Sequence, residues 1–266
     1  MKILFIGDIF GEAGRIMTKN LLPKLKEKYS PNLTIANAEN LTHGNGFSPK
    51  HIEEMQEAGV DFFTSGNHFM GAKDGVAKLD DPDFPAIRPA NYPSEGVPGR
   101  GYEVIEDDDG KKVLVVNLMG RVFLKKDFDC PFRVMDKILQ ETKGENLSAI
   151  FVDFHAEATS EKIALGQYLD GRVSAVIGTH THVATCDSRI LGEGTAYMSD
   201  VGFVGPLDSI IGVQKDTVIN SFLTQLPFKH EPETAGEIVF NAVLVEVDEK
   251  TGKALNVDHV RKISQP

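Results

Sequence analysis

Cysteine is scarce in this chain of 266 residues, which holds only Cys130 and Cys186. Two cysteines exclude a disulfide framework and fit a reducing compartment. The sequence also lacks any uninterrupted apolar run of the ~18 residues that a membrane span requires. The apolar N-terminus, MKILFIGDIF, is interrupted by Asp8 and precedes no small-residue cleavage site, so it predicts a first strand and not a signal peptide. We therefore expect a cytoplasmic protein with no membrane association.

Positive charge is also in short supply. The chain has 28 Lys and Arg residues against 39 Asp and Glu residues, which gives a formal charge of −11 and a pI of about 5.2. Such a surface repels a long polyphosphate backbone, so we expect no stable nucleic-acid complex. A small phosphate ester is still an acceptable ligand, because bound metal ions can reverse the local potential.

Strand and helix patterns alternate in the first half of the chain. The expected strands are residues 2–8 (KILFIGD), 33–40 (LTIANAEN) and 61–68 (DFFTSGNH). A helical pattern follows the first strand, and Pro23 should break or kink it. A second helix should begin with Ser48 as N-cap and Pro49 as its first residue, and should stop at Gly59. This alternation predicts βαβ units and a mostly parallel sheet.

Strands dominate the second half. Hairpins are expected at residues 102–120, 189–200 and 237–263, and helices at 131–144 and 159–169. With a hydrophobic content of 41%, no internal repeat and no composition break, the chain predicts a single domain over residues 1–266. The expected fold class is α/β, with two packed sheets and helices outside them.

Polar side chains with ligating atoms follow five separate apolar runs. The carboxyl ends of parallel strands meet at one edge of a sheet, where ligand sites form. Five such ends therefore predict one common crevice. In chain order its residues are Asp8, Glu39, Asn40, Asn67, His68, His155, His180 and His182.

The stretch AVIGTHTHVAT, residues 175–185, places His180 and His182 one residue apart at the end of an apolar run. If the strand continues through Thr181, both imidazoles point to the same side, because side chains at i and i+2 of a strand share a face. Imidazole is the commonest metal ligand in proteins. For this stretch alone, a loop that happens to hold two histidines is an equal alternative.

The ligand types taken together indicate a metal site. Carboxylate, imidazole and amide groups without thiolate suit iron, manganese or zinc. Without His68, the list contains seven candidate ligands. Seven exceed what one tetrahedral ion needs and match two ions that share a carboxylate bridge. We expect two divalent or mixed-valence transition-metal ions, with iron first and manganese or zinc as alternatives.

The ordered motifs resemble the calcineurin-like metallophosphoesterases, and among them the bacterial YmdB-type branch. The matching segments are FIGDIFGEAGR, NAENLTHGNGF, GNH, RPANYP, DFHAEATSEK and GTHTHV, and the resemblance spans nearly the whole chain. It implies the metallophosphoesterase fold, a two-sheet β-sandwich flanked by helices in an α/β/β/α arrangement.

The resemblance also implies a role for each candidate residue. One metal ion would be held by Asp8, Glu39, Asn40 and His182, and the other by Glu39, Asn67, His155 and His180, with Glu39 as the bridge. His68 would be the proton donor. The wider superfamily has Asp-x-His as its first motif and a bridging Asp, whereas this chain has Phe10 after Ile9 and has Glu39 as the bridge. Asn40 would supply the contact that Phe10 cannot make.

The expected activity is hydrolysis of a small phosphodiester by attack of a metal-bridging hydroxide, with His68 protonating the leaving alkoxide. The resemblance indicates 2′,3′-cyclic nucleotides as substrates. One alternative is a metal-binding regulatory protein with weak or no turnover. Another is a phosphomonoesterase with the same metal site, which should add a cation such as Arg88 or Arg121. The sequence leaves open whether the chain forms a homo-oligomer.

Other residues allow two interpretations each. His43 either contacts substrate or is a plain loop residue, and Asp153 either orients an imidazole or is unrelated to the site. Cys186 is expected to be a small buried hydrophobic residue. Ordinary surface positions are expected for the remaining histidines, His51, His230 and His259.

Overall fold

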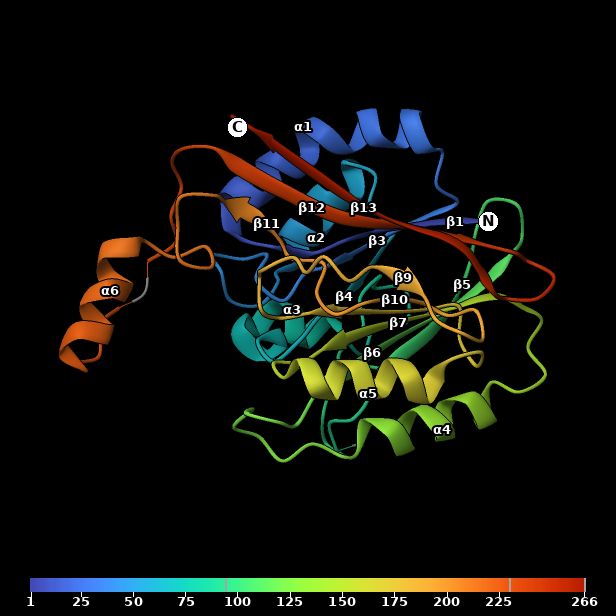
Figure 1. The fold of residues 1–266 in the computed structure, drawn as a ribbon. Helices are drawn as coiled ribbons and strands as arrows, with labels where there is room; N and C mark the ends of the chain where they lie inside the picture. The colour runs from blue at the N-terminus through green and yellow to red at the C-terminus, as the bar shows by residue number, and fades with distance from the viewer. Residues whose placement is uncertain (94, 230, 266) are drawn as a thin grey trace.

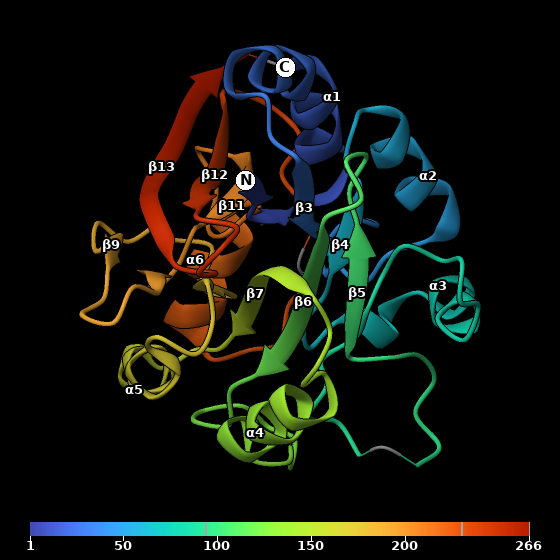
Figure 2. The ribbon, with the colours of Figure 1, turned by 90° about the vertical axis from the view of Figure 1, so that its right-hand side faces the viewer.

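Two β-sheets lie face to face at the centre of the molecule, and helices cover their outer faces (Figures 1 and 2). The computed structural model describes residues 1–93, 95–229 and 231–265. The first sheet has the strand order β2-β11-β12-β1-β3-β4, with β13 paired to β12. Its strands are β1 (Lys2–Ile6), β2 (Asp8–Ile9), β3 (Leu33–Asn37), β4 (Phe62–Thr64), β11 (Phe203–Pro206), β12 (Ile238–Val247) and β13 (Ala254–Ser264).

The second sheet has the order β5-β6-β7-β8-β10-β9. Its strands are β5 (Tyr102–Glu106), β6 (Lys112–Met119), β7 (Leu147–His155), β8 (Ala175–Thr179), β9 (Arg189–Ile190) and β10 (Ala196–Met198). Strands β6, β7, β8 and β10 are parallel, as are β1, β3 and β4 in the first sheet. These parallel strands bring the carboxyl ends of β3, β4, β7 and β8 to one region of the molecule.

Alternating side chains of each strand divide the apolar core into layers. In β1, Ile3 and Phe5 point into the cluster between the sheets, where the ring of Phe5 lies 5.0 Å from that of Phe151 in β7. Leu4 and Ile6 of the same strand point outward to the cluster under the N-terminal helices. A strand buried on both faces needs a continuous apolar run, which KILFI supplies.

Helices close the two outer faces. The outer face of the first sheet is covered by α1 (Gly11–Tyr29) and α2 (Pro49–Glu57), and that of the second by α4 (Pro131–Glu141) and α5 (Thr159–Leu169). The α/β/β/α arrangement expected from the sequence is thereby confirmed. Short elements complete the chain: the 3-10 turn η1 (Phe69–Gly71), α3 (Lys73–Lys78) and α6 (Lys215–Thr224), which projects away from both sheets (Figure 1).

The prediction that Pro23 breaks or kinks the first helix is wrong in its stronger form, because α1 continues through Pro23 to Tyr29. Proline removes one backbone hydrogen bond from a helix. Here the neighbouring side chains of Leu22 and Leu25 are buried against the first sheet and hold both halves of the helix in place. Among the described residues, no helix has the length and hydropathy that a bilayer crossing requires.

Candidate metal centre

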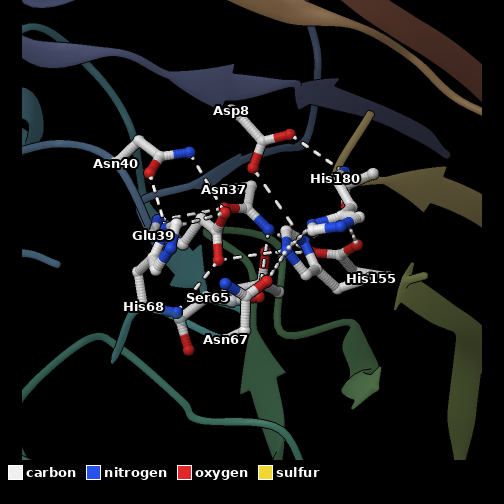
Figure 3. Close-up of polar contacts among 12 residues, drawn as sticks. Asp8, Asn37, Glu39, Asn40, Ser65, Asn67, His68, His155 and His180 are labelled. Carbon is white, nitrogen blue, oxygen red and sulfur yellow. Dashed lines mark hydrogen bonds and ion pairs between the residues drawn. The ribbon is translucent and has the colours of Figure 1, made fainter. Parts of the chain in front are cut away.

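The carboxyl ends of β1, β3, β4, β7 and β8, with the segments that follow them, bring the predicted polar residues together at one edge of the two sheets (Figure 3). Glu39, His155 and His180 each offer one ligand atom, and these atoms lie within 4.8 Å of one another. His155 Nε2 is 3.0 Å from Glu39 Oε2 and 3.1 Å from His180 Nδ1. Asn67 Oδ1 is 3.2 Å from the same nitrogen. This first cluster contains the four residues that the resemblance assigns to one ion.

A second cluster contains Asp8, Glu39 and His182, whose ligand atoms also lie within 4.8 Å of one another. Asn40 turns its amide nitrogen toward this cluster, with Nδ2 3.0 Å from His182 Nε2 and 3.1 Å from Glu39 Oε1. Ligation of an ion by its side-chain oxygen would therefore require the amide group to turn over. Glu39 is common to both clusters, which is the position that a bridging carboxylate requires.

Three features of the clusters fit two cations. First, Asp8 Oδ1 is buried and has no hydrogen-bond partner among the described residues. The nitrogen His155 Nδ1 is 4.0 Å away from it. Second, the sequence has glycine where a side chain would fill the site: a Cβ on Gly66 would lie 2.2 Å from Glu39 Oε2 and 2.4 Å from His155 Nε2. Third, the donors are the carboxylate, imidazole and amide groups that transition metals accept.

The electrostatics of the buried carboxylates also favour bound cations. Burial raises the pKa of Asp8 well above its usual value, and the negative charges of Glu39 and Asp200 add to that effect. Burial also raises the pKa of Glu39, but the adjacent His155 outweighs it and holds that pKa well below its usual value. A cation at the site would stabilise both carboxylates in their charged form.

The imidazoles are in different states. Burial lowers the pKa of His155, but the carboxylates of Glu39 and Asp8 raise it to about 9 overall. For His180, burial and the charge of His155 lower the pKa to about 3, so this ring is neutral and one of its nitrogens carries a lone pair. Burial likewise lowers the pKa of His182. Neutral imidazole is the form that ligates metals.

Hydrogen bonds orient the ring of His155. Thr179 Oγ1 donates its single proton to Asp153 Oδ1 over 2.6 Å, so it accepts from His155 Nδ1 over 2.9 Å. The Nε2 atom of His155 then faces the first cluster, where a bound cation would replace the proton that the raised pKa of this ring keeps on it. Asp153 is itself held by Asn37 Nδ2 at 2.9 Å and by Thr64 Oγ1 at 2.5 Å. Of the two interpretations of Asp153, these contacts support the one in which it orients an imidazole.

The rings of His182 and His180 are each also held in place through one ring nitrogen. His182 Nδ1 donates to the carbonyl oxygen of Ile211 over 2.9 Å, which leaves Nε2 for the second cluster. His180 Nε2 is 3.1 Å from Glu157 Oε2, which leaves Nδ1 for the first. A ring nitrogen bonded to a protein acceptor fixes the tautomer and the direction of the other nitrogen.

The expectation that His180 and His182 share one face of a strand is wrong, because β8 ends at Thr179. Both histidines have left-handed backbones, with φ of 100° and 63°. This conformation costs ~1–3 kcal/mol for a residue other than glycine, so the surroundings must enforce it. Turning the backbone sends the rings to different clusters instead of to one face.

A buried ion pair that the sequence analysis did not single out supports this turn. Lys162 Nζ is 2.6 Å from Asp200 Oδ2 and donates to the carbonyl oxygen of Thr179 over 2.8 Å. Asp200 Oδ2 also accepts from the backbone N–H of Thr181 over 3.1 Å. The signal in the sequence was a lysine on the inward side of a helix, within the DFHAEATSEK motif.

His68 stands beside both clusters without belonging to either. The strand β4 ends at Thr64, earlier than expected, and a turn brings both Asn67 and His68 to the site. The Nδ1 atom of His68 is 3.0 Å from Asn40 Oδ1 and 3.5 Å from Glu39 Oε1, and its side chain is 45% exposed. Its backbone N–H donates to Glu39 Oε2 over 3.2 Å.

A cavity of about 440 Å³ opens over the clusters. His43, with φ of 53°, lines it together with His68, His180 and His182. The apolar part of its lining comes from Phe10, Ile211, Val213 and Pro232. The position of His43 supports a contact with substrate over a plain loop role.

Several remaining expectations have definite outcomes. Arg88 is buried and donates to the carbonyl oxygens of Pro89 and Pro98, so it does not supply a cation to the cavity.

Cys186 is exposed, contrary to the prediction of a buried residue. His51 is half-buried against Thr42, not a free surface residue. His259 is also half-buried, and His230 lies outside the described residues.

Comparisons with known proteins agree with this geometry. A family model described as YmdB-like protein matches residues 4–260. The 2′,3′-cyclic-nucleotide 2′-phosphodiesterase of Bacillus subtilis (strain 168) is 46% identical over 261 residues, which are 98% of this chain and 96% of that one.

Two solved structures extend the comparison. A crystal structure described as a novel phosphatase from Mycoplasma pneumoniae superposes with a TM-score of 0.91 at 37% identity, and covers 100% of this chain and 94% of that chain. The sulfate thiohydrolase SoxB of Thermus thermophilus has a TM-score of 0.55 at 12% identity, covering 96% of this chain and 43% of that chain. The latter similarity shows a shared fold alone.

Proposed function

The chain belongs to the YmdB-like protein family, and we propose that it is a dinuclear-metal phosphodiesterase that hydrolyses 2′,3′-cyclic nucleotides. The observation that carries the proposal is the shared position of Glu39 in two carboxylate–histidine clusters. The substrate class is supported by the relative from B. subtilis, a 2′,3′-cyclic-nucleotide 2′-phosphodiesterase that is similar over nearly the full length of both chains.

We assign Glu39, Asn67, His155 and His180 to one ion and Asp8, Glu39, Asn40 and His182 to the other. When bound, such ions polarise a phosphoryl oxygen and activate water as a nucleophile. The residues of the chain contribute the fixed geometry, since each histidine has one nitrogen held by an acceptor and the other turned to its cluster.

His68 is assigned as the proton donor to the leaving ribose oxygen. Its Nδ1 is held by Asn40 Oδ1, and its Nε2 has no hydrogen-bond partner among the described residues. Nε2 is therefore the atom available to a substrate in the cavity, which the half-exposed ring can reach.

The phosphomonoesterase alternative is weakened because neither Arg88 nor Arg121 is among the described residues that line the cavity over the clusters. A monoester carries more negative charge than a diester, and an enzyme for it should supply an added cation. The guanidinium of Arg88 is instead used by two backbone carbonyl oxygens. The cavity over the clusters is lined by histidine, asparagine and apolar residues, and by Glu39 as its one charged carboxylate among the described residues.

A substrate panel tests the proposal. Metal-replete protein is assayed on adenosine 2′,3′-cyclic phosphate, on adenosine 3′-monophosphate and on bis(4-nitrophenyl) phosphate, with Glu39→Ala as the inactive control. We expect turnover of the diesters and little of the monoester. Faster hydrolysis of the monoester would establish the phosphomonoesterase instead. No turnover by protein that holds two metal ions would favour a regulatory role.

A further inference from the structure

The loop between β6 and α4 forms a second cavity beside the clusters. This cavity has a volume of about 360 Å³ and is separate from the one over the metal clusters, but His68 lines both. Its lining residues are Asn67, His68, Phe123, Leu124, Lys125, Lys126 and Phe128. It therefore begins at the metal ligand Asn67 and the assigned proton donor His68, and it extends along the loop.

The start of the loop is fixed to the catalytic edge. Met119, the last residue of β6, pairs with His155, and the backbone N–H of Gly120 donates to the carbonyl oxygen of His155 over 3.0 Å. The buried carboxylate of Glu161 then accepts from the backbone N–H groups of Arg121 and Val122 over 3.0 and 3.1 Å. The path of the chain out of the strand is thereby set.

The end of the loop is fixed as well. Phe128 is buried, and its ring lies 4.8 Å from that of Tyr92, which in turn lies 4.9 Å from Phe69, the residue after His68. The backbone N–H of Asp129 donates to the carbonyl oxygen of Asn91 over 2.9 Å. Because both ends of the loop are held by these contacts, the residues at its tip are kept at the surface. In Figure 1 this loop leads into α4 and extends past the ends of the neighbouring helices.

The tip presents an aromatic ring to solvent. Phe123 is 83% exposed and has a left-handed backbone with φ of 65°. Exposing a phenylalanine and straining its backbone both cost free energy, so a stability role does not account for this residue. Strained, exposed positions of this kind cluster at ligand sites.

Three cations lie close to Phe123 in the sequence, in a chain that is acidic as a whole. Arg121, Lys125 and Lys126 lie within six residues, RVFLKK, whereas the chain as a whole has a formal charge of −11. Lys126 lies over the ring of Tyr92, with Nζ 5.2 Å from its centroid. An exposed aromatic side chain beside cations is an arrangement on which nucleobases stack.

We propose that this cavity is the nucleoside subsite, in which the base of the substrate stacks on Phe123. The proposal rests on the proposed function, because it places the ribose at His68 and the scissile phosphate over the clusters. Stacking uses the face of the base and reads no hydrogen-bonding edge. The site should therefore accept purines and pyrimidines, with purines favoured for their larger rings.

Kinetics with matched substrates test the subsite. Phe123→Ala should lower kcat/KM for adenosine 2′,3′-cyclic phosphate about 5- to 150-fold, equivalent to about 1–3 kcal/mol of stacking, mainly through KM. The same variant should leave glycerol 1,2-cyclic phosphate unaffected, since that diester has the same reactive ring and no base. Phe123→Tyr should keep the wild-type values. Equal losses on both substrates, or no loss on either, would overturn the subsite.

A binding measurement separates the subsite from the proposed function. The chain contains no tryptophan, so Phe123→Trp introduces a single fluorescent reporter. Adenosine 3′-monophosphate should quench it in a saturable way, and should not quench Phe222→Trp, a control on α6 where the native ring is 73% exposed. Quenching without any turnover of cyclic phosphates would contradict the proposed function and keep the subsite. Turnover by wild type without quenching in Phe123→Trp would exclude the subsite and keep the function.

Discussion

Glu39 faces both ligand clusters, whereas Asp8 faces only one. We predict that Glu39→Ala loses both metal ions and that Asp8→Ala retains about half of the metal bound by wild type. The reason is geometric, since removing a shared carboxylate takes one ligand from each ion. Elemental analysis of the purified variants measures the difference.

The comparison needs folded variants. Removing one member of a buried charged group destabilises a protein by ~3–5 kcal/mol, so thermal unfolding of both variants serves as the control. Equal metal content in two folded variants would argue against a bridging Glu39.

His68 is the residue whose assigned role depends on the leaving group. A ribose alkoxide needs a proton in the transition state, whereas a nitrophenolate needs little help. General acid catalysis contributes ~10²–10⁴-fold. We therefore expect His68→Ala to lose about that factor in kcat/KM on a 2′,3′-cyclic nucleotide, and much less on bis(4-nitrophenyl) phosphate.

Metal content is measured on the same His68→Ala sample, because the ring also contacts Asn40 and lies near Glu39. A similar loss on both substrates, with the metal retained, would show that His68 positions the substrate and does not donate a proton.

The hydroxyl of Thr179 connects His155 to Asp153. Thr179→Val keeps the shape of the side chain and removes this link. Loss of such an outer contact costs ~10–100-fold in metal affinity, and we expect that decrease in a metal titration.

The chain offers a matched control for Thr179→Val. The hydroxyl of Thr34 in β3 is also buried, and it has no hydrogen-bond partner among the described residues. Thr34→Val should bind metal as wild type does. If both variants bind metal normally, the orientation of His155 does not depend on the relay.

At the scale of elements, the turn after β4 is the part of the site with least space. Gly66 lies between β4 and η1, and a Cβ there would overlap Glu39 Oε2 and His155 Nε2. We predict that Gly66→Ala reduces metal content below one ion per chain while the protein still folds. Gly192→Ala is the control, since the nearest atom to its Cβ is 3.8 Å away. Full metal content in Gly66→Ala would mean that the turn shifts to admit the methyl group.

Sequence patterns predicted the elements where local and tertiary preferences agree. The helix expected at residues 159–169 matches α5, and the Ser48–Pro49 start of α2 is as predicted. Sequence patterns gave wrong predictions where contacts with residues distant in the sequence determine the backbone conformation. Pro23 stays helical because its neighbours are buried. His180 leaves the strand because Asp200 and Lys162, both far along the chain, hold the turn around it.

The same distinction applies to the site. The strand-end rule brought out all eight candidate residues, since it depends only on parallel strands ending at one edge. The sequence left Asp153 with two interpretations and did not bring out Thr179 or Glu157 as partners of the imidazoles, because those contacts depend on side-chain directions. Nor could it find the cavity at Phe123, which is built by a loop with no repeating pattern.

For the whole molecule, the clusters connect metal binding to stability. Asp8, Glu39 and His155 are buried at the edge where both sheets meet, so cations bound there hold loops from both sheets together. A ligand that binds only the folded state at 100 times its Kd stabilises it by ~2.7 kcal/mol. In a chain of this size ~1 kcal/mol changes Tm by ~2–4 °C.

We therefore predict about two transition-metal ions per chain in protein purified without chelator, and a fall in Tm of roughly 5–10 °C for each ion that a chelator removes. Calorimetry with and without chelator measures the shift, and elemental analysis confirms the removal. Glu39→Ala is the control: without its metal, its Tm should not respond to chelator. An unchanged Tm in wild type after both ions have been removed would show that the two sheets meet at this edge without help from the metals, and that the clusters serve chemistry alone.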